Sequence, residues 1–146
     1  MFKFIFITII SIISLSNLNA EIVKKVEING NNRISDETIK VYGNIKINKD
    51  YSELDLNNLI KDLYSTDFFE NIELNLKNNT LIILVKEYPI INQLIIIGEK
   101  KKAFKEEVKK LIKLKEKKSF IKSSLLSDVE TIKKIYSSFG YNSAEV

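Results

Sequence analysis

The feature that most constrains the fold is a pattern of elements that occurs twice in succession along the chain. Each occurrence begins with an apolar strand pattern and a glycine turn, continues with two amphipathic helix patterns, and returns to a strand. The first copy occupies residues 21–88 and the second occupies residues 89–146. This order predicts tandem α+β domains of βααββ form, in which two helices pack on a three-stranded mixed sheet.

The first half of copy one carries clear signals for where its helices begin and end. A strand is predicted over Ile22–Ile28, followed by a turn at Gly30. Ser35 is a suitable N-cap for a short helix that ends at Gly43. A second helix is predicted from Ser52, which has capping-box spacing to Asp55.

The second half of copy one predicts a hairpin. Polar and apolar residues alternate along its first strand, as expected for an element with one buried face. That strand contains Glu70, Asn71, Ile72, Glu73, Leu74, Asn75 and Leu76. Asn78 and Asn79 form a two-residue turn, because asparagine tolerates positive φ. The apolar run within residues 80–86 predicts a strand with neighbours on both sides, and Pro89 ends it.

Copy two repeats these elements but stops before the last one. A strand is predicted over residues 90–97, with a turn at Gly98. Two helices follow, the first with Phe104 and Val108 on its apolar face and the second ending at Gly140. Residues 141–146 match the start of the alternating strand, and no hairpin partner follows. We therefore expect an incomplete second unit, belonging to a fragment of a longer protein.

Residues 1–20 have the order of a secretory signal peptide. Lys3 precedes an apolar core over residues 4–15, and a polar stretch ends at Ala20. The alternative is a transmembrane anchor, but this core would span only about 18 Å as a helix, against about 30 Å of hydrocarbon. We therefore expect cleavage between Ala20 and Glu21.

The composition argues against catalysis and nucleic-acid binding. The chain has no Cys and no His, so it lacks a thiol nucleophile, a disulfide, and the commonest general base and metal ligand. We assign no catalytic residue, cofactor or metal. The net charge is +4, but Arg33 is the sole arginine, which favours a lysine-solubilised surface over nucleic-acid recognition. The acidic residues between Asp50 and Asp67 are the only support for a carboxylate enzyme, and we interpret them instead as a solvated helix face.

Three segments resemble the POTRA (polypeptide-transport-associated) family. Residues 26–34 resemble its opening strand and glycine turn, and residues 63–72 its passage from helix to strand. Residues 85–91 are similar to a Val-x-Glu-x-Pro-x-Ile junction between the first and second domains, in which Glu87, Tyr88 and Pro89 form the inter-domain joint. Within the family, the resemblance is to the outer-membrane protein assembly factors that form the barrel subunit of the Bam complex.

The resemblance implies a place and a role. POTRA domains of such proteins lie in the periplasm, while a C-terminal barrel, absent from this chain, holds the protein in the outer membrane. They are thought to receive unfolded outer-membrane protein precursors and to dock accessory lipoproteins. Strand addition is the favoured mode, which agrees with an open edge along residues 70–76. The alternative is that Glu73 and Lys77 merely shield this edge against aggregation.

Other functions fit parts of the pattern. A translocation-assembly subunit or a two-partner secretion pore would carry similar domains before a barrel. A periplasmic division protein with one such domain and an inner-membrane anchor fits less well, because the leader is short and a second unit is present.

Overall fold

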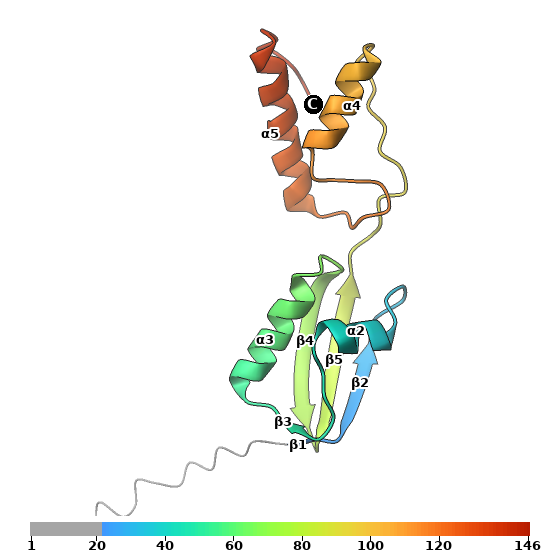
Figure 1. Ribbon diagram of the computed structural model, residues 1–146, viewed down its shortest axis with the longest axis vertical. Helices are drawn as coiled ribbons and strands as arrows, with labels where there is room; N and C mark the ends of the chain where they lie inside the picture. The colour runs from blue at the N-terminus through green and yellow to red at the C-terminus, as the bar shows by residue number, and fades with distance from the viewer. Residues whose placement is uncertain (1–21) are drawn as a thin grey trace, which may run out of the picture.

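The computed structural model describes residues 22–146, in which unit one (residues 22–88) and unit two (residues 89–146) lie end to end (Figure 1). Unit one has a three-stranded mixed sheet in the order β2-β5-β4, with β2 parallel and β4 antiparallel to the central β5. A small ribbon of β1 and β3 closes one end. The elements are β1 Ile22–Val23, β2 Lys25–Asn29, α2 Asp36–Tyr42, β3 Lys49–Asp50, α3 Glu53–Tyr64, β4 Phe69–Lys77 and β5 Thr80–Glu87.

The predicted caps and turn of unit one are confirmed. The Ser35 hydroxyl accepts a hydrogen bond from the N–H of Thr38 at the start of α2. Ser52 and Asp55 form a reciprocal capping box at the start of α3. Asn78 and Asn79 have φ values of 51° and 60°, which suit a two-residue hairpin. Local side chains therefore determine where these elements begin and end.

The core of unit one lies between the helices and one face of the sheet. It is formed by side chains from β1, α2, α3, β4 and β5 and by Tyr51 just before α3, namely Val23, Ile39, Tyr51, Leu59, Leu63, Phe69, Ile72, Leu81, Ile83 and Val85. The apolar run in β5 was expected to mark a strand with neighbours on both sides, and β5 is indeed central. However, the helices cover one face only, so Leu84 on the other face is 47% exposed.

The strand predicted over residues 22–28 is divided in two. The N–H groups of Lys24 and Lys25 both donate to the carbonyl oxygen of Asn79, at 2.7 and 3.2 Å. Residues 22–23 pair with β3, whereas residues 25–29 pair with β5. The chain changes partner at Lys24 because the hairpin turn approaches it there, a contact that no local pattern reveals.

Unit two contains α4 Lys102–Leu111 and α5 Lys122–Ser138. The strands predicted over residues 90–97 and 141–146 are not formed, apart from a single bridge between Ile90 and Ser119. In unit one, β2 and β4 both bond with β5, and no counterpart of β5 follows α5 among residues 22–146. Without it the two segments have no ladder partner.

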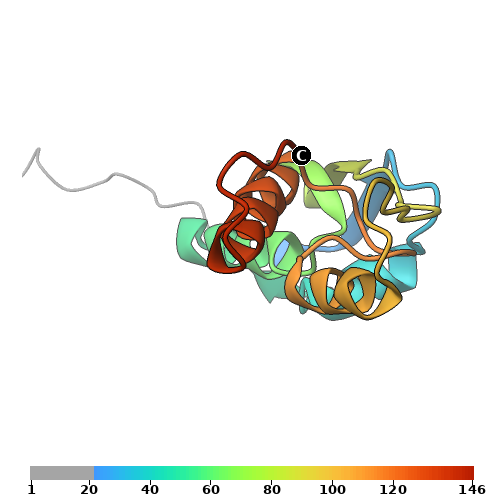
Figure 2. The ribbon, with the colours of Figure 1, turned by 90° about the horizontal axis from the view of Figure 1, so that it is seen from above.

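An apolar groove of about 530 Å³ lies where unit two has no central strand. Its walls include Phe104 and Val108 of α4, Ile132 of α5, and the extended segments 94–97 and 144–146. Viewed from above, α4 and α5 lie side by side (Figure 2). In unit one β5 lies between the corresponding segments, β2 and β4, whereas in unit two the groove occupies this place.

Candidate functional site

The candidate peptide-binding segment, residues 70–76, lies wholly within β4. β4 is at the edge of the sheet and pairs only with β5 among residues 22–146. A bulge between Phe69 and Asn71 interrupts the pairing at the start of the strand. From Asn71 onward the register is regular, so one side of this part of β4 pairs with β5 and the other side pairs with no strand among residues 22–146.

The backbone donors on the open side of β4 follow from its register. Lys77 and Thr80 flank the two-residue turn and are paired, and such a pair exchanges hydrogen bonds in a tight hairpin. Bonded and unbonded pairs alternate along an antiparallel ladder, so the odd-numbered residues of 73–77 bond with β5. The N–H groups that point to the open side are those of Ile72, Leu74 and Leu76.

A hydrogen bond between β4 and α3 independently shows that the Ile72 N–H points to the open side of β4. The N–H of Ile72 donates to the hydroxyl of Tyr64 at 3.1 Å, so it points away from β5. Tyr64 is the last residue of α3 and its side chain is partly exposed. One of the three outward donors of β4 is therefore already occupied by a side chain.

The charged side chains of β4 are held along the sheet. Glu73 accepts a hydrogen bond from the amide of Asn71 at 2.9 Å, and Glu70 pairs with Lys86 of β5 at 2.7 Å. Glu73 alternates with core-facing residues, so its side chain stands on the uncovered face of the sheet rather than in the plane of the open edge. The Glu73 side chain therefore does not cover the outward N–H groups of Leu74 and Leu76, which are the two closest to the hairpin turn.

The predicted joint is held by one carboxylate. Glu87 is the last residue of β5 and its side chain is only 7% exposed. One of its oxygens accepts hydrogen bonds at 2.8–3.0 Å from the backbone N–H groups of Asn32, Arg33 and Ile34. The other pairs with the Arg33 guanidinium at 3.0 Å, and this guanidinium also donates to the carbonyl of Tyr88. Glu87 thus joins the glycine turn to the start of the connection between the units.

On the far side of the joint, backbone hydrogen bonds hold the connection to unit two. The carbonyl of Pro89 accepts from the N–H of Phe120 at 2.7 Å. Ile91 exchanges hydrogen bonds with the 117–118 segment, donating to Lys118 and accepting from Lys117. Asp128 of α5 has a buried carboxylate that accepts hydrogen bonds from the N–H groups of residues 113 and 114. These bonds hold the loop between α4 and α5 against α5.

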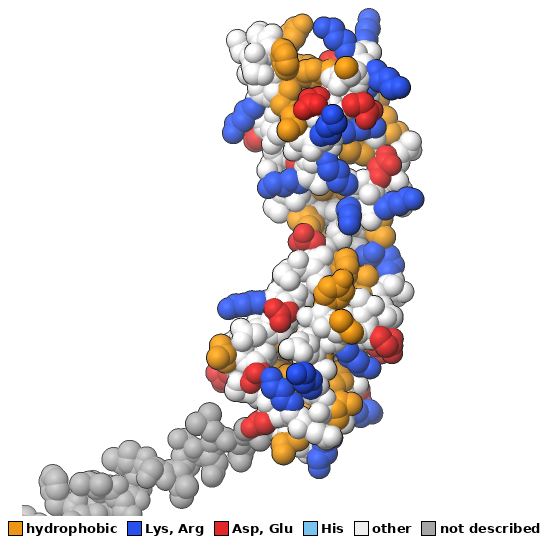
Figure 3. All heavy atoms as spheres, viewed as in Figure 1, with side chains coloured by type: hydrophobic (Ala, Val, Ile, Leu, Met, Phe, Trp, Pro, Cys, Tyr) orange, Lys and Arg blue, Asp and Glu red, His pale blue; other side chains and the backbone are white. Residues whose placement is uncertain are grey.

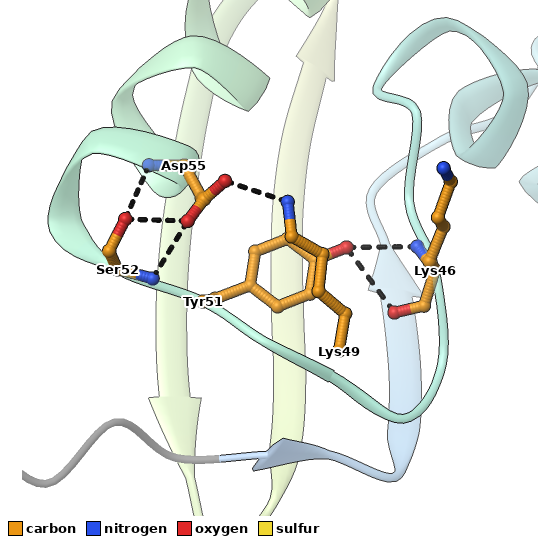
Figure 4. A network of polar contacts seen from close by, with 5 residues as sticks. All are labelled: Lys46, Lys49, Tyr51, Ser52 and Asp55. Carbon is orange, nitrogen blue, oxygen red and sulfur yellow. Dashed lines mark hydrogen bonds and ion pairs between the residues drawn. The ribbon is translucent and has the colours of Figure 1, made fainter.

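A second polar network surrounds Asp55 at the start of α3 (Figure 4). Its carboxylate accepts from the hydroxyl and N–H of Ser52 and pairs with Lys49 at 2.7 Å. Lys49 also lies over the ring of Tyr51, whose hydroxyl accepts from the N–H of Lys46. Asp55 therefore stabilises the start of α3. Residues 22–146 contain no cluster of three or more side chains suited to a metal ion.

Acid is expected to weaken unit one through Glu87 and Asp55. Burial opposes ionisation of Glu87, but the three backbone N–H groups and Arg33 outweigh it and lower its pKa. The hydrogen bond from Lys49, assisted by Ser52, lowers the pKa of Asp55 from 3.8 to about 2. Because both pKa values are depressed on folding, their stabilisation is complete at neutral pH and is lost as these groups become protonated.

Urea unfolding at a series of pH values measures this loss. The free energy of unfolding should be flat near neutral pH and fall as the pH drops from about 4.5 towards 2. Glu87→Gln and Asp55→Asn should each lower stability at pH 7 and flatten the slope in this acid range. An unchanged slope in both variants would contradict the assignment.

Sequence reasoning predicted the open strand over residues 70–76 and the joint at residues 87–89, but it did not predict the side chains that contact them. The Arg33–Glu87 pair and the Tyr64–Ile72 hydrogen bond were not predicted. A signal for the first exists, since Arg33 is the sole arginine and Glu87 is the acidic residue of the junction. The predicted cleavage site between Ala20 and Glu21 lies outside the described residues.

On the face shown in Figure 3, lysine side chains are spread over both units with acidic side chains among them. Across residues 22–146, none of the helices is sufficiently long and apolar to cross a membrane.

Comparison with known families gives a match over both units. The POTRA family model, described as "Surface antigen variable number repeat", matches residues 21–88 and 89–146. A curated relative, the outer membrane protein assembly factor BamA of Neorickettsia risticii (strain Illinois), is 28% identical over 81 residues. The matched part covers 56% of this chain but only 11% of that relative.

Two solved structures have a similar fold. The N-terminal domain of Omp85 from Thermosynechococcus elongatus superposes with a TM-score of 0.54 and 14% identity, covering 82% of this chain and 52% of that one. POTRA1-3 of the periplasmic domain of Omp85 from Anabaena gives a TM-score of 0.50 with the same identity and coverage. At these identities the likeness concerns the fold alone.

Proposed function

Since the chain belongs to the POTRA family, we propose that it is the periplasmic POTRA region of an outer-membrane protein assembly factor. In this role it receives unfolded β-barrel precursors and docks accessory lipoproteins for insertion of the precursors into the outer membrane. The similarity to a BamA protein supports the assembly role. The observation that carries the proposal is the open side of β4, which offers backbone hydrogen bonds to an extended chain.

The proposed binding mode is strand addition along residues 70–76. A precursor segment would pair with the outward N–H and C=O groups of Leu74 and Leu76, extending the sheet by one strand. Affinity would come mainly from the backbone, so it should depend weakly on client sequence. Unfolded barrel strands alternate apolar and polar residues, and such a segment could place its apolar side next to Leu74 and Leu76.

Photo-crosslinking in cells tests this role. We expect a benzoylphenylalanine at Glu73, in the open strand, to form adducts with outer-membrane protein precursors identified by mass spectrometry. The same probe at Val41, which is 76% exposed on α2 away from the sheet, is the matched control. Precursor adducts should be several-fold more abundant at position 73, and equal yields at both positions would argue against β4 as the client site.

Export is part of the proposal. Residues 1–20 would act as a signal peptide, with the mature protein beginning at Glu21 and carrying POTRA domains over 21–88 and 89–146. N-terminal sequencing of the periplasmic or outer-membrane fraction should return Glu-Ile-Val. An intact Met1 in the membrane fraction would contradict cleavage.

The joint of Glu87, Tyr88 and Pro89 would limit movement between the two units. The short connection and the ties of Glu87 to Arg33 and of Pro89 to Phe120 support this part of the proposal. Small-angle scattering should fit one narrow range of inter-unit angles, whereas freely tumbling units would contradict a tight joint.

A further inference from the structure

Tyr64 lies at the point where the open side of β4 meets α3. Tyr64 is 39% exposed, and its hydroxyl accepts a hydrogen bond from the backbone N–H of Ile72 at 3.1 Å. In position this hydroxyl oxygen corresponds to the carbonyl oxygen that a neighbouring strand would supply to the same N–H. The side chain thus imitates one hydrogen bond of a fourth strand.

The occupied donor is the third in a row. Leu76, Leu74 and Ile72 present successive outward N–H groups, and the one nearest the bulge is paired with Tyr64. A peptide added from the hairpin turn would meet two outward donors before it reached the hydroxyl. At Ile72 its carbonyl would replace an existing hydrogen bond instead of forming an additional one.

From this geometry we infer that Tyr64 is a specificity-determining residue that limits the register of strand addition on β4. The inference rests on the proposed binding mode and adds a boundary to it. The Tyr64 hydroxyl ends the client-binding segment at Leu74, so bound segments are short and centred near the hairpin turn. Removal of the hydroxyl releases the Ile72 donor and extends the segment by one hydrogen bond.

The test uses Tyr64→Phe in the otherwise unaltered protein, with a blocked octapeptide of alternating valine and threonine as the probe. Amide chemical shifts are followed during an NMR titration. In the unaltered protein, shifts should centre on Leu74 and Leu76. In the variant, Ile72 should join them, and affinity should rise about three- to tenfold, the effect of one further hydrogen bond.

The matched control is Tyr42→Phe. Tyr42 is likewise the last residue of its helix, but its ring packs against Phe68 and its hydroxyl is not bonded to β4 in the structure. This variant should bind the peptide like the unaltered protein. Equal affinity for Tyr64→Phe and the unaltered protein, with Ile72 unaffected in both, would overturn the inference while leaving strand addition intact. Absence of shifts along β4 in all three proteins would overturn the proposed binding mode as well.

A length series on the unaltered protein tests the same boundary without a substitution. Alternating valine–threonine peptides of four, six, eight and ten residues are compared. Each carries one bulky residue at the end that lies next to the hairpin turn, so that all four bind in the same register. Affinity should stop rising once the peptide reaches Leu74. A steady rise through the longest peptide, with Ile72 shifting early, would contradict the boundary even if Tyr64→Phe fails to fold.

Discussion

Replacement of Gly30 by alanine is expected to destabilise unit one by at least about 3 kcal/mol. Gly30 has a φ of +88°, and a Cβ there would lie 2.1 Å from the carbonyl oxygen of Val85. The left-handed backbone alone costs roughly 1–2 kcal/mol for a residue with a side chain, and the clash with backbone adds to it. The turn and β5 would have to separate, which would also weaken the bonds from residues 32–34 to Glu87.

Gly98→Ala is the matched control for this prediction. Gly98 has a similar φ of +84°, but an added Cβ meets nothing within 4 Å. The Gly98→Ala variant should therefore lose only the free energy that the left-handed backbone costs, roughly 1–2 kcal/mol. Urea unfolding followed by circular dichroism measures both variants, and equal losses would show that the approach to Val85 does not constrain the turn.

Asn75→Pro is expected to destabilise the hairpin rather than to act only on binding. Asn75 is paired with Ile82, and the register directs its N–H towards β5. Proline removes this ladder hydrogen bond, leaves its acceptor on β5 without a partner, and introduces a ring into the strand pair. We expect a loss of at least about 2–3 kcal/mol, mainly from the unsatisfied acceptor and local distortion.

Asn75→Ala separates the backbone effect from the side chain. The Asn75 side chain is exposed, and alanine keeps the N–H, so stability should change by less than about 0.5 kcal/mol. Thermal unfolding distinguishes the two variants directly. A proline variant as stable as the alanine variant would mean that the Asn75 N–H points to the open side, and the deduced direction of the donors would be wrong.

Much of unit one was predictable because its signals are local. Ser35, Ser52 and the Asn78-Asn79 turn each act on neighbouring backbone, so a pattern of a few residues suffices to recognise them. The predicted α+β fold and POTRA relationship are confirmed. They were predictable because the order of such locally encoded elements is diagnostic of the family.

The remaining features depend on contacts between distant residues. The break at Lys24 arises from Asn79, and the Glu87 carboxylate binds a turn more than fifty positions earlier. The strand predicted over residues 90–97 has a suitable sequence but finds no ladder partner among residues 22–146 beyond the single bridge at Ile90, and a strand cannot satisfy its backbone alone. Likewise, the role of Tyr64 became visible only when the register of β4 placed the Ile72 N–H on the open side.

The most direct test of strand addition is a crystal structure of the protein with the alternating valine–threonine octapeptide bound. The account predicts the peptide as a fourth strand beside β4, hydrogen-bonded to the backbone of Leu74 and Leu76. A peptide on the free side of β2, on the helices, or in the apolar groove of unit two would contradict it.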